Sequence, residues 1–431
     1  MKTYLFLALL TISQVALGQK TIIHCGRLID GTTEQPQTEK SIIIEGKAIT
    51  SVENGYTKPG NADVVIDLSN STVMPGFIDM HVHIEGESSP RAYMSRFTDN
   101  PADVAFKSTV YARKNLMAGF TTLRDLGGSG VNIALRNAIN RGTVIGPRIF
   151  TSGKGIKITG GHGDPTNGYR WDLMGNPGPD EGVVNGPWEA RKAVRQRMKE
   201  GSDVIKITST GGVLSVARDG SGPSFTEEEI KAIVETANDL GMHVASHAHG
   251  IEGMQRAIRA GVKTIEHGTY MDDETMELMK EYGTYYIPTI IAGVSAAENG
   301  AKPGYYPEVV AKKAREIGPL IQATFTKAYK AGVNIGFGTD AAVFPHGENA
   351  REFELMVEAG MKPMEAIKAA TSVNSKILGK GDVFGSIQSG LLADIVAVDG
   401  DPLSDISILK NISFVMKEGA VYKLNGEATV R

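Results

Sequence analysis

The chain has 431 residues, of which 41% are hydrophobic and 22% are charged, and its formal net charge is −4. This length is enough for one large domain with a smaller companion, and the composition is that of a soluble globular protein. Because the chain carries no basic stripe, we exclude nucleic acid as a partner.

Residues 1–18 have the pattern of a secretory signal peptide. Lys2 supplies a positive start, an apolar stretch runs on to Leu17, and Ala16-Leu17-Gly18 forms a small-x-small cleavage site. A buried first helix or strand is the alternative. No other stretch is long and apolar enough to cross a bilayer, so we expect a periplasmic or secreted protein without a membrane anchor. Its single cysteine, Cys25, rules out an internal disulfide.

Residues 19–72 are predicted to form the N-terminal part of a small β domain. Short alternating runs such as residues 41–49 are separated by Gly and Pro, which is typical of strands and turns. The same pattern of short strand-like runs occurs in residues 383–431, for example at 393–398 and 412–416. We therefore predict that the two ends of the chain form one β-sandwich domain.

Residues 73–382 alternate strand-like runs with helical patterns, which is typical of βα units around a parallel sheet. One helix is clearly marked, because Thr226 can cap it, Glu229 follows at the capping-box spacing, and Gly241 ends it. The strand-like runs begin near Val73, Gly119, Pro147, Asp203, His243, Val262, Tyr285 and Val333. Eight such runs predict a (β/α)8 TIM barrel.

Residues with metal-ligand chemistry stand at the ends of these apolar runs: His81, His83, Lys206, His247, His267 and Asp340. On a strand, the spacing of His81 and His83 places both imidazoles on one face, where they can reach one cation. A lone pair of this kind fits a hydrogen-bonded core pair equally well. Since barrel active sites lie at the C-terminal ends of the strands, the recurrence at strand ends favours a two-metal hydrolase site.

These motifs resemble those of the amidohydrolase superfamily, in the branch of metal-dependent dipeptidases and imidazolonepropionase-like hydrolases. The resemblance is carried by residues 75–83, Gly338-Thr339-Asp340-Ala341 and Gly390-Leu391-Leu392-Ala393-Asp394, and it covers nearly the whole mature chain. It implies that His81, His83 and Asp340 bind a first metal ion. It implies that His247 and His267 bind a second.

Lys206 favours the binuclear form of the site, because similar enzymes with one metal lack this lysine. A protonated lysine would be repelled by two cations, whereas a lysine of lowered pKa among apolar neighbours can add carbon dioxide and bridge the metals as a carbamate. We expect two divalent ions, zinc first, with carbon dioxide on Lys206. The resemblance also makes Asp340 the catalytic proton acceptor. A solvent-facing lysine and a helix-capping aspartate are the alternatives.

Three further residues are candidates for contact with the substrate. His249 lies two residues after His247 and shares its strand face, so it is either the true ligand or a substrate contact; the resemblance favours the second role. His162 stands in a glycine-rich loop after the third strand, where it is either an oxyanion or carboxylate donor or an exposed turn residue. Gly212 lies in a second glycine loop that can offer backbone N–H groups. The insertion at 165–187 is predicted to be a lid or pocket wall.

We therefore predict an exported binuclear amidohydrolase that cleaves a dipeptide, Xaa-Pro first, or an N-acyl amino acid, including ochratoxin-like amides. The Xaa-Pro preference rests on the resemblance to prolidase-like members. The alternative is a mononuclear cyclic-amide hydrolase or deaminase, and a third reading is an exported binding protein without chemistry. The expected partner is a small-molecule or dipeptide substrate, and the sequence leaves a homo-oligomer open.

Overall fold

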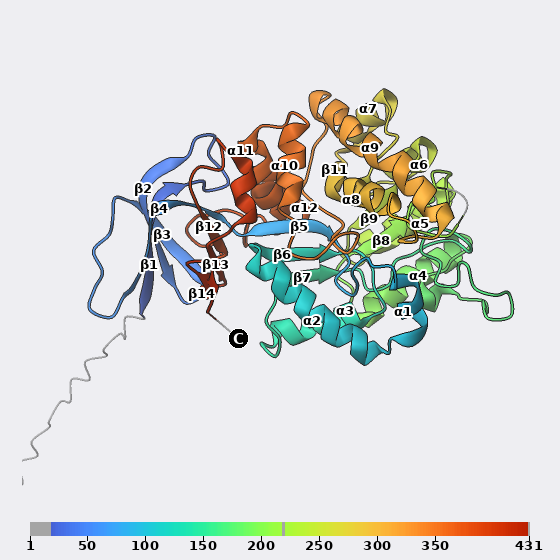
Figure 1. Ribbon diagram of the computed structural model, residues 1–431, viewed down its shortest axis with the longest axis horizontal. Helices are drawn as coiled ribbons and strands as arrows, with labels where there is room; N and C mark the ends of the chain where they lie inside the picture. The colour runs from blue at the N-terminus through green and yellow to red at the C-terminus, as the bar shows by residue number, and fades with distance from the viewer. Residues whose placement is uncertain (1–18, 218–219, 430–431) are drawn as a thin grey trace, which may run out of the picture.

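The computed structural model describes residues 19–217 and 220–429, and the expected signal peptide at 1–18 lies outside these described residues. The described chain forms a small β domain at one end of the molecule and a larger α/β domain at the other (Figure 1). Both termini belong to the β domain, where the blue and red segments lie side by side. None of the described helices is long and apolar enough to cross a membrane.

The β domain is one sheet with the strand order β15-β14-β13-β12-β4-β1-β2-β3. Its N-terminal strands are β1 (Lys20–Leu28), β2 (Gln37–Glu45), β3 (Ala48–Asn54) and β4 (Val64–Pro75). Its C-terminal strands are β12 (Ile395–Asp399), β13 (Phe414–Lys417), β14 (Ala420–Leu424) and β15 (Glu427–Ala428). The two ends of the chain meet where β12 runs antiparallel to β4.

The sequence predicted a β-sandwich domain made from the two ends of the chain. The strands form a single hydrogen-bonded sheet that curls around its own core. The curl is visible where β3, at one edge of the sheet, bonds to the segment just before β12: Ile49 N–H donates to Leu391 O (2.8 Å) and Ala393 N–H to Lys47 O (2.8 Å). The enclosed core is apolar and includes the buried Cys25.

The α/β domain contains two parallel sheets. One has the order β5-β6-β7, with strands at Phe77–Val82, Phe120–Asp125 and Arg148–Thr151. The other has the order β11-β10-β9-β8, with strands at Tyr285–Ile287, Thr264–His267, Val244–Ala248 and Ile205–Thr208. The first strand begins later than the predicted Val73, because β4 continues to Pro75 and the chain turns at Gly76.

The predicted eighth strand, near Val333, is not formed as a regular strand. Residues 334–341 instead make separate backbone bonds to both sheets: Tyr286 N–H donates to Asn334 O (2.8 Å), Met80 N–H to Phe337 O (3.0 Å), and Asp340 N–H to His81 O (2.7 Å). Glycines 336 and 338 and the left-handed φ of Asp340 (59°) interrupt the ladder. An isolated bridge between Ile156 and Ile207 joins the other edges.

Helices surround these two sheets (Figure 1). They are α1 (Ala92–Thr98), α2 (Pro101–Met117), α3 (Val131–Asn140), α4 (Pro187–Glu200), α5 (Glu227–Asp239), α6 (Ile251–Arg259), α7 (Asp273–Tyr282), α8 (Ile290–Gly300), α9 (Glu308–Lys330), α10 (Arg351–Glu358), α11 (Pro363–Lys368) and α12 (Asn374–Ile377). The predicted cap of α5 is confirmed: Thr226 Oγ1 accepts from Glu229 N–H, and the Glu229 carboxylate accepts from Thr226 N–H.

Partly buried ion pairs join the two domains. Arg148, on β7, donates to Asp394 (2.7 Å) and Glu418 (3.0 Å) of the β domain. Because β7 enters from this side, the pairs lie at the N-terminal end of the strand, away from the C-terminal ends that carry the predicted ligands.

Candidate active site

All six predicted metal ligands line one cavity of about 500 Å³, a size typical of small-molecule sites. They come from the ends of β5, β8, β9 and β10 and from the segment at 334–341. His81 Nε2 lies 3.6 Å from Asp340 Oδ1, and His83 Nε2 lies 3.4 Å from the same oxygen. The other histidines join this group through ring contacts, with His267 centred 5.0 Å from His81 and 4.6 Å from His247. The folding of separate strands therefore brings the six side chains together.

Each ligand histidine is oriented by a hydrogen bond on one ring nitrogen. His81 Nδ1 bonds to Glu266 Oε2 (2.9 Å), His83 Nδ1 to Gly127 O (2.9 Å) and His267 Nδ1 to Thr289 Oγ1 (2.7 Å). These three rings therefore keep Nε2 for coordination. In His247 the pattern is reversed, since Nε2 bonds to Gly211 O (3.2 Å) and Nδ1 remains. An acceptor bonded to one ring nitrogen fixes the tautomer of a metal-binding imidazole.

The electrostatics of the cluster favour metal binding. Burial lowers the pKa of His81, His247 and His267 well below the ordinary value, so these imidazoles are neutral and carry free lone pairs. Burial raises the pKa of Asp340 to about 7 and lowers that of Lys206 to about 8. Within the described chain, Asp340 Oδ1 is buried without a hydrogen-bond partner.

This unpartnered oxygen tests whether the residues fit a metal. Burying an acceptor without a partner is costly, and a cation in contact with Asp340 Oδ1 and the two facing imidazoles would remove that cost. Ligand atoms of His81, His267 and Asp340 lie within 4.8 Å of one another. A set of imidazoles and a carboxylate suits zinc and related divalent ions. The residues present therefore fit a metal centre.

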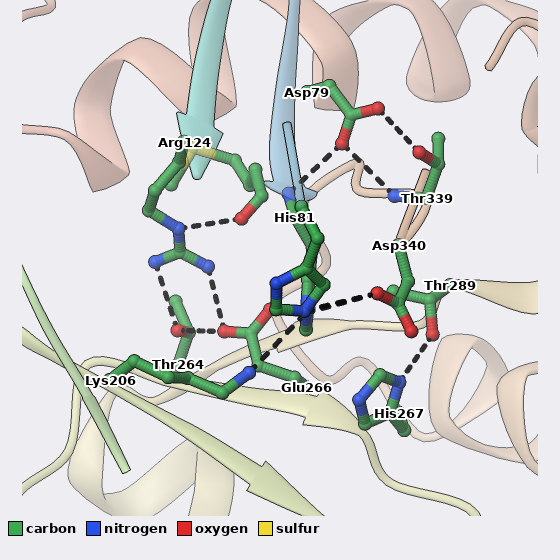
Figure 2. Close-up of polar contacts among 12 residues, drawn as sticks. Asp79, His81, Arg124, Lys206, Thr264, Glu266, His267, Thr289, Thr339 and Asp340 are labelled. Atoms are coloured by element: carbon green, nitrogen blue, oxygen red, sulfur yellow. Dashed lines mark hydrogen bonds and ion pairs between the residues drawn. The ribbon is translucent and has the colours of Figure 1, made fainter. Parts of the chain in front are cut away.

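Lys206 lines the same cavity as the five other predicted ligands. Its Nζ is 3.4 Å from His81 Nε2 (Figure 2). Its positive charge lowers the pKa of all four ligand histidines and opposes the rise in the pKa of Asp340.

The backbone is strained at two of the ligands. His267 has a φ of 71° and Asp340 a φ of 59°, which is the left-handed region that costs a non-glycine residue about 1–3 kcal/mol. Both lie immediately before or within the turn that ends a sheet segment. This conformation turns the two side chains toward the cavity.

A buried Arg124-Glu266 pair supports His81, and the sequence analysis missed it. Arg124 Nη2 donates to Glu266 Oε1 (2.7 Å), and Arg124 Nε donates to Met80 O (2.7 Å), next to the ligand (Figure 2). Both side chains are fully buried. The available signal was a charged residue inside each of two apolar strands, but their pairing becomes evident only when β6 and β10 are placed together.

Asp79 is a second residue that the sequence analysis did not single out. It is fully buried on β5 and accepts from His81 N–H (3.0 Å) and Thr339 Oγ1 (2.6 Å) (Figure 2). It also accepts from Asn349 Nδ2 (2.7 Å). It thus ties the strand that carries His81 to the segment that carries Asp340. Its position two residues before His81 was the only sequence signal.

Two of the three predicted substrate contacts line the cavity. His162 stacks on His247 with ring centres 4.3 Å apart, and in the described structure its Nδ1 is buried without a partner. His249 Nδ1 bonds to Thr269 Oγ1 (2.7 Å), and its ring stacks on His267. Both rings are therefore held beside the ligands.

Gly212 is placed differently from its prediction. It is not among the residues that line the cavity, and its carbonyl accepts from Lys313 Nζ (2.8 Å). Its hydrogen faces the His162 ring, because a Cβ added at Gly212 would lie 2.3 Å from His162 Nδ1. The glycine leaves room for a cavity histidine.

The substitution Gly212→Ala is expected to displace His162 and to lower kcat/KM of the predicted hydrolase by up to about 10²-fold, the loss that misplacing an active-site group by about 1 Å can cause. Steady-state kinetics would measure this loss. Gly178→Ala is a matched control, since a Cβ there meets nothing within 4 Å. Unchanged kinetics in Gly212→Ala would show that the position of His162 is irrelevant to turnover.

Comparison with known proteins agrees with this geometry. The amidohydrolase family profile matches residues 72–423. The ochratoxinase of Aspergillus niger is 34% identical over 96% of this chain and 89% of its own length. A Xaa-Pro dipeptidase crystallised with methionine in its active site is 51% identical, with a TM-score of 0.92 over 94% of this chain and all of that one.

A prolidase in complex with N-methylphosphonate-L-proline is 31% identical, with a TM-score of 0.85 over 94% of this chain and 100% of its own. These matches span nearly the whole chain, and they include the segments that carry the clustered histidines, lysine and aspartate. The chain belongs to the amidohydrolase family, in its prolidase-like branch, and is a hydrolase of amide C–N bonds.

Proposed function

We propose that the chain is an exported, binuclear metal-dependent amidohydrolase that cleaves a dipeptide, Xaa-Pro first, or an N-acyl amino acid, including ochratoxin-like amides. The observation that supports the binuclear form is the position of Lys206, whose amine lies 3.4 Å from His81 Nε2 and lines the same cavity as the five other ligands. His81, His83 and Asp340 would hold one ion, and His247 and His267 the other.

A carbamate on Lys206 would join the two halves of this set. The amine adds to the carbon of carbon dioxide, one proton leaves the nitrogen for solvent, and the product is an anion with two oxygen donors. Among the described residues, the buried amine hydrogen-bonds to His81 Nε2 (3.4 Å) and forms no ion pair with a carboxylate. An anion at this point would offset the two positive charges.

Bound divalent ions would supply Lewis acidity toward the substrate carbonyl and lower the pKa of the attacking water. Asp340 would accept the proton of that water and return it to the leaving nitrogen as the amide bond breaks. His162 and His249, on the ring faces of His247 and His267, would donate to the carbonyl oxygen or to a substrate carboxylate.

The relatives support the substrate class. A methionine lies in the active site of the related Xaa-Pro dipeptidase, and a proline phosphonate is bound by the related prolidase. The relationship to ochratoxinase extends the class to other amides of amino acids. The proposal of export rests on the sequence of residues 1–18 alone. We also propose that the two sheets close into an eight-membered barrel, because residues 334–341 form backbone hydrogen bonds to both of them.

The test is the metal content of the purified protein, measured by elemental analysis beside hydrolysis of a panel of Xaa-Pro dipeptides and N-acyl amino acids. Two ions per chain are expected, falling toward one or none in Lys206→Ala together with activity. Lys157→Met is a matched control for the metal content alone, because Lys157 is also a buried lysine at the cavity wall but donates to the carbonyls of Gly155 and Glu181.

One ion per chain, unchanged on loss of Lys206, would contradict the binuclear proposal and favour a mononuclear cyclic-amide hydrolase or deaminase. Two ions without hydrolysis of any substrate would favour a binding protein. The control variant is expected to keep the full metal content.

A further inference from the structure

One wall of the active-site cavity carries no charged side chain. It is formed by α8 and α9, the two long helices between β11 and the segment at 334–341 (Figure 1). The lining residues from α8 are Ala292, Gly293 and Ala296. Those from α9 are Ala314, Ile317, Gly318 and Ile321. We call these residues the α8-α9 wall.

The α8-α9 wall is preformed by close helix packing. A Cβ added at Gly318 would lie 2.5 Å from Gly293 O, so the two helices touch at their glycines. The start of α8 is fixed by the buried Glu352 carboxylate, which accepts from Ile290 N–H (2.9 Å) and Ile291 N–H (2.7 Å). A wall held in this way keeps its shape when a ligand enters.

Every charged side chain of the cavity comes from other elements: Glu87, Arg96, Lys157, Lys206 and Asp340. The lysine that α9 does contribute nearby, Lys313, donates to the carbonyls of Gly212 and Ser215 and does not line the cavity. The cavity is therefore divided, with its lysine and arginine side chains on α1, on the loop after β7 and on β8, and with aliphatic groups on α8 and α9.

We propose that the α8-α9 wall is the subsite for the acyl half of the scissile amide and that it selects apolar acyl chains. The assignment rests on the proposed function, in which the amine half carries a carboxylate. A carboxylate loses its hydration without compensation against aliphatic side chains, whereas Arg96 and Lys157 can receive it. The acyl half must then face the helices.

This assignment predicts how rate depends on the acyl chain. Each methylene transferred from water to an apolar wall raises kcat/KM about fourfold. Going from N-acetyl- to N-hexanoyl-L-proline should therefore raise kcat/KM about 10²-fold. The kcat/KM values of N-succinyl- and N-(6-aminohexanoyl)-L-proline should be about 10²-fold lower than that of the hexanoyl substrate, because the wall offers no partner for either charge.

Two variants of the zinc-loaded protein change the wall in opposite directions. Ala296→Leu fills the subsite and should lower kcat/KM for the hexanoyl substrate about tenfold or more while leaving the acetyl substrate within about twofold. Ile317→Ala enlarges the subsite and should raise kcat/KM for N-octanoyl-L-proline relative to that for N-hexanoyl-L-proline. Leu320→Ala is the matched control, because Leu320 lies on α9 but is 40% exposed and does not line the cavity.

Equal kcat/KM for the acetyl, hexanoyl and succinyl substrates would overturn the assignment, and so would an equal loss on all chains in Ala296→Leu. Thermal denaturation of both variants, read beside the kinetics, identifies any misfolded sample, and Ile317→Ala still decides the case if Ala296→Leu does not fold. Failure of every acyl-proline and dipeptide would contradict the proposed function itself.

Discussion

Asp340→Asn is expected to lower kcat for the amide substrate about 10³-fold. Asparagine keeps the size of the side chain and one oxygen, but it cannot accept the proton of the attacking water or return it to the leaving nitrogen. Asp340 Oδ1 faces His81 Nε2 and His83 Nε2, so the amide oxygen can still contribute to the metal site. The loss should therefore appear in kcat, measured at saturating substrate in the fully loaded protein.

Asp394→Asn is the matched control for this experiment. Asp394 is also a buried carboxylate, but it pairs with Arg148 at the joint between the domains. Its replacement should lower thermal stability and leave kcat unchanged. If Asp340→Asn retained a tenth of the wild-type kcat with its metals in place, another group would have to move the proton.

Arg124→Met is expected to destabilise the fold by about 3–5 kcal/mol, because it leaves the Glu266 carboxylate buried without its cation. Arg124 is fully buried and donates to Glu266, Thr264 and Met80. The same change should weaken zinc binding about 10- to 100-fold, since Glu266 holds the ring of His81. Urea unfolding and competition with a zinc chelator measure the two effects.

A double substitution separates the two roles of this pair. Arg124→Met with Glu266→Gln removes both charges, so most of the lost stability should return while zinc affinity stays low. Arg148→Met, at the domain joint, breaks a partly buried pair and should lower stability without changing zinc affinity. A double variant with wild-type zinc affinity would contradict the positioning role of Glu266.

The six candidate ligands could be predicted because their signal is local. Each ends an apolar run, and a strand converts the His81-His83 spacing into a shared face. The Arg124-Glu266 pair could not be predicted. In the sequence each residue is only an isolated charged residue within an apolar strand, and its partner lies on a different strand. The contact between Gly212 and His162 could not be predicted for the same reason, because the two residues are distant in sequence.

The larger architecture was predicted in part. Alternating patterns located seven parallel strands, and the eighth run kept the apolar character of a strand. Its glycines and the left-handed Asp340 prevent a regular ladder, and hydropathy does not report backbone geometry. The β domain likewise has strands where alternation predicted them, but alternation cannot distinguish two stacked sheets from one sheet that curls on itself.

The left-handed backbone at His267 and Asp340 links the folding of this protein to its metal supply. The strained turns raise the free energy of the folded chain, and any ion that binds the folded chain alone lowers it by an amount that grows with the logarithm of the ion's concentration. Glycine at either position would relieve the strain but remove a ligand, so a search for more stable variants in the absence of metal would tend to discard the active site. The melting temperature of the wild-type chain should therefore rise with the concentration of free metal.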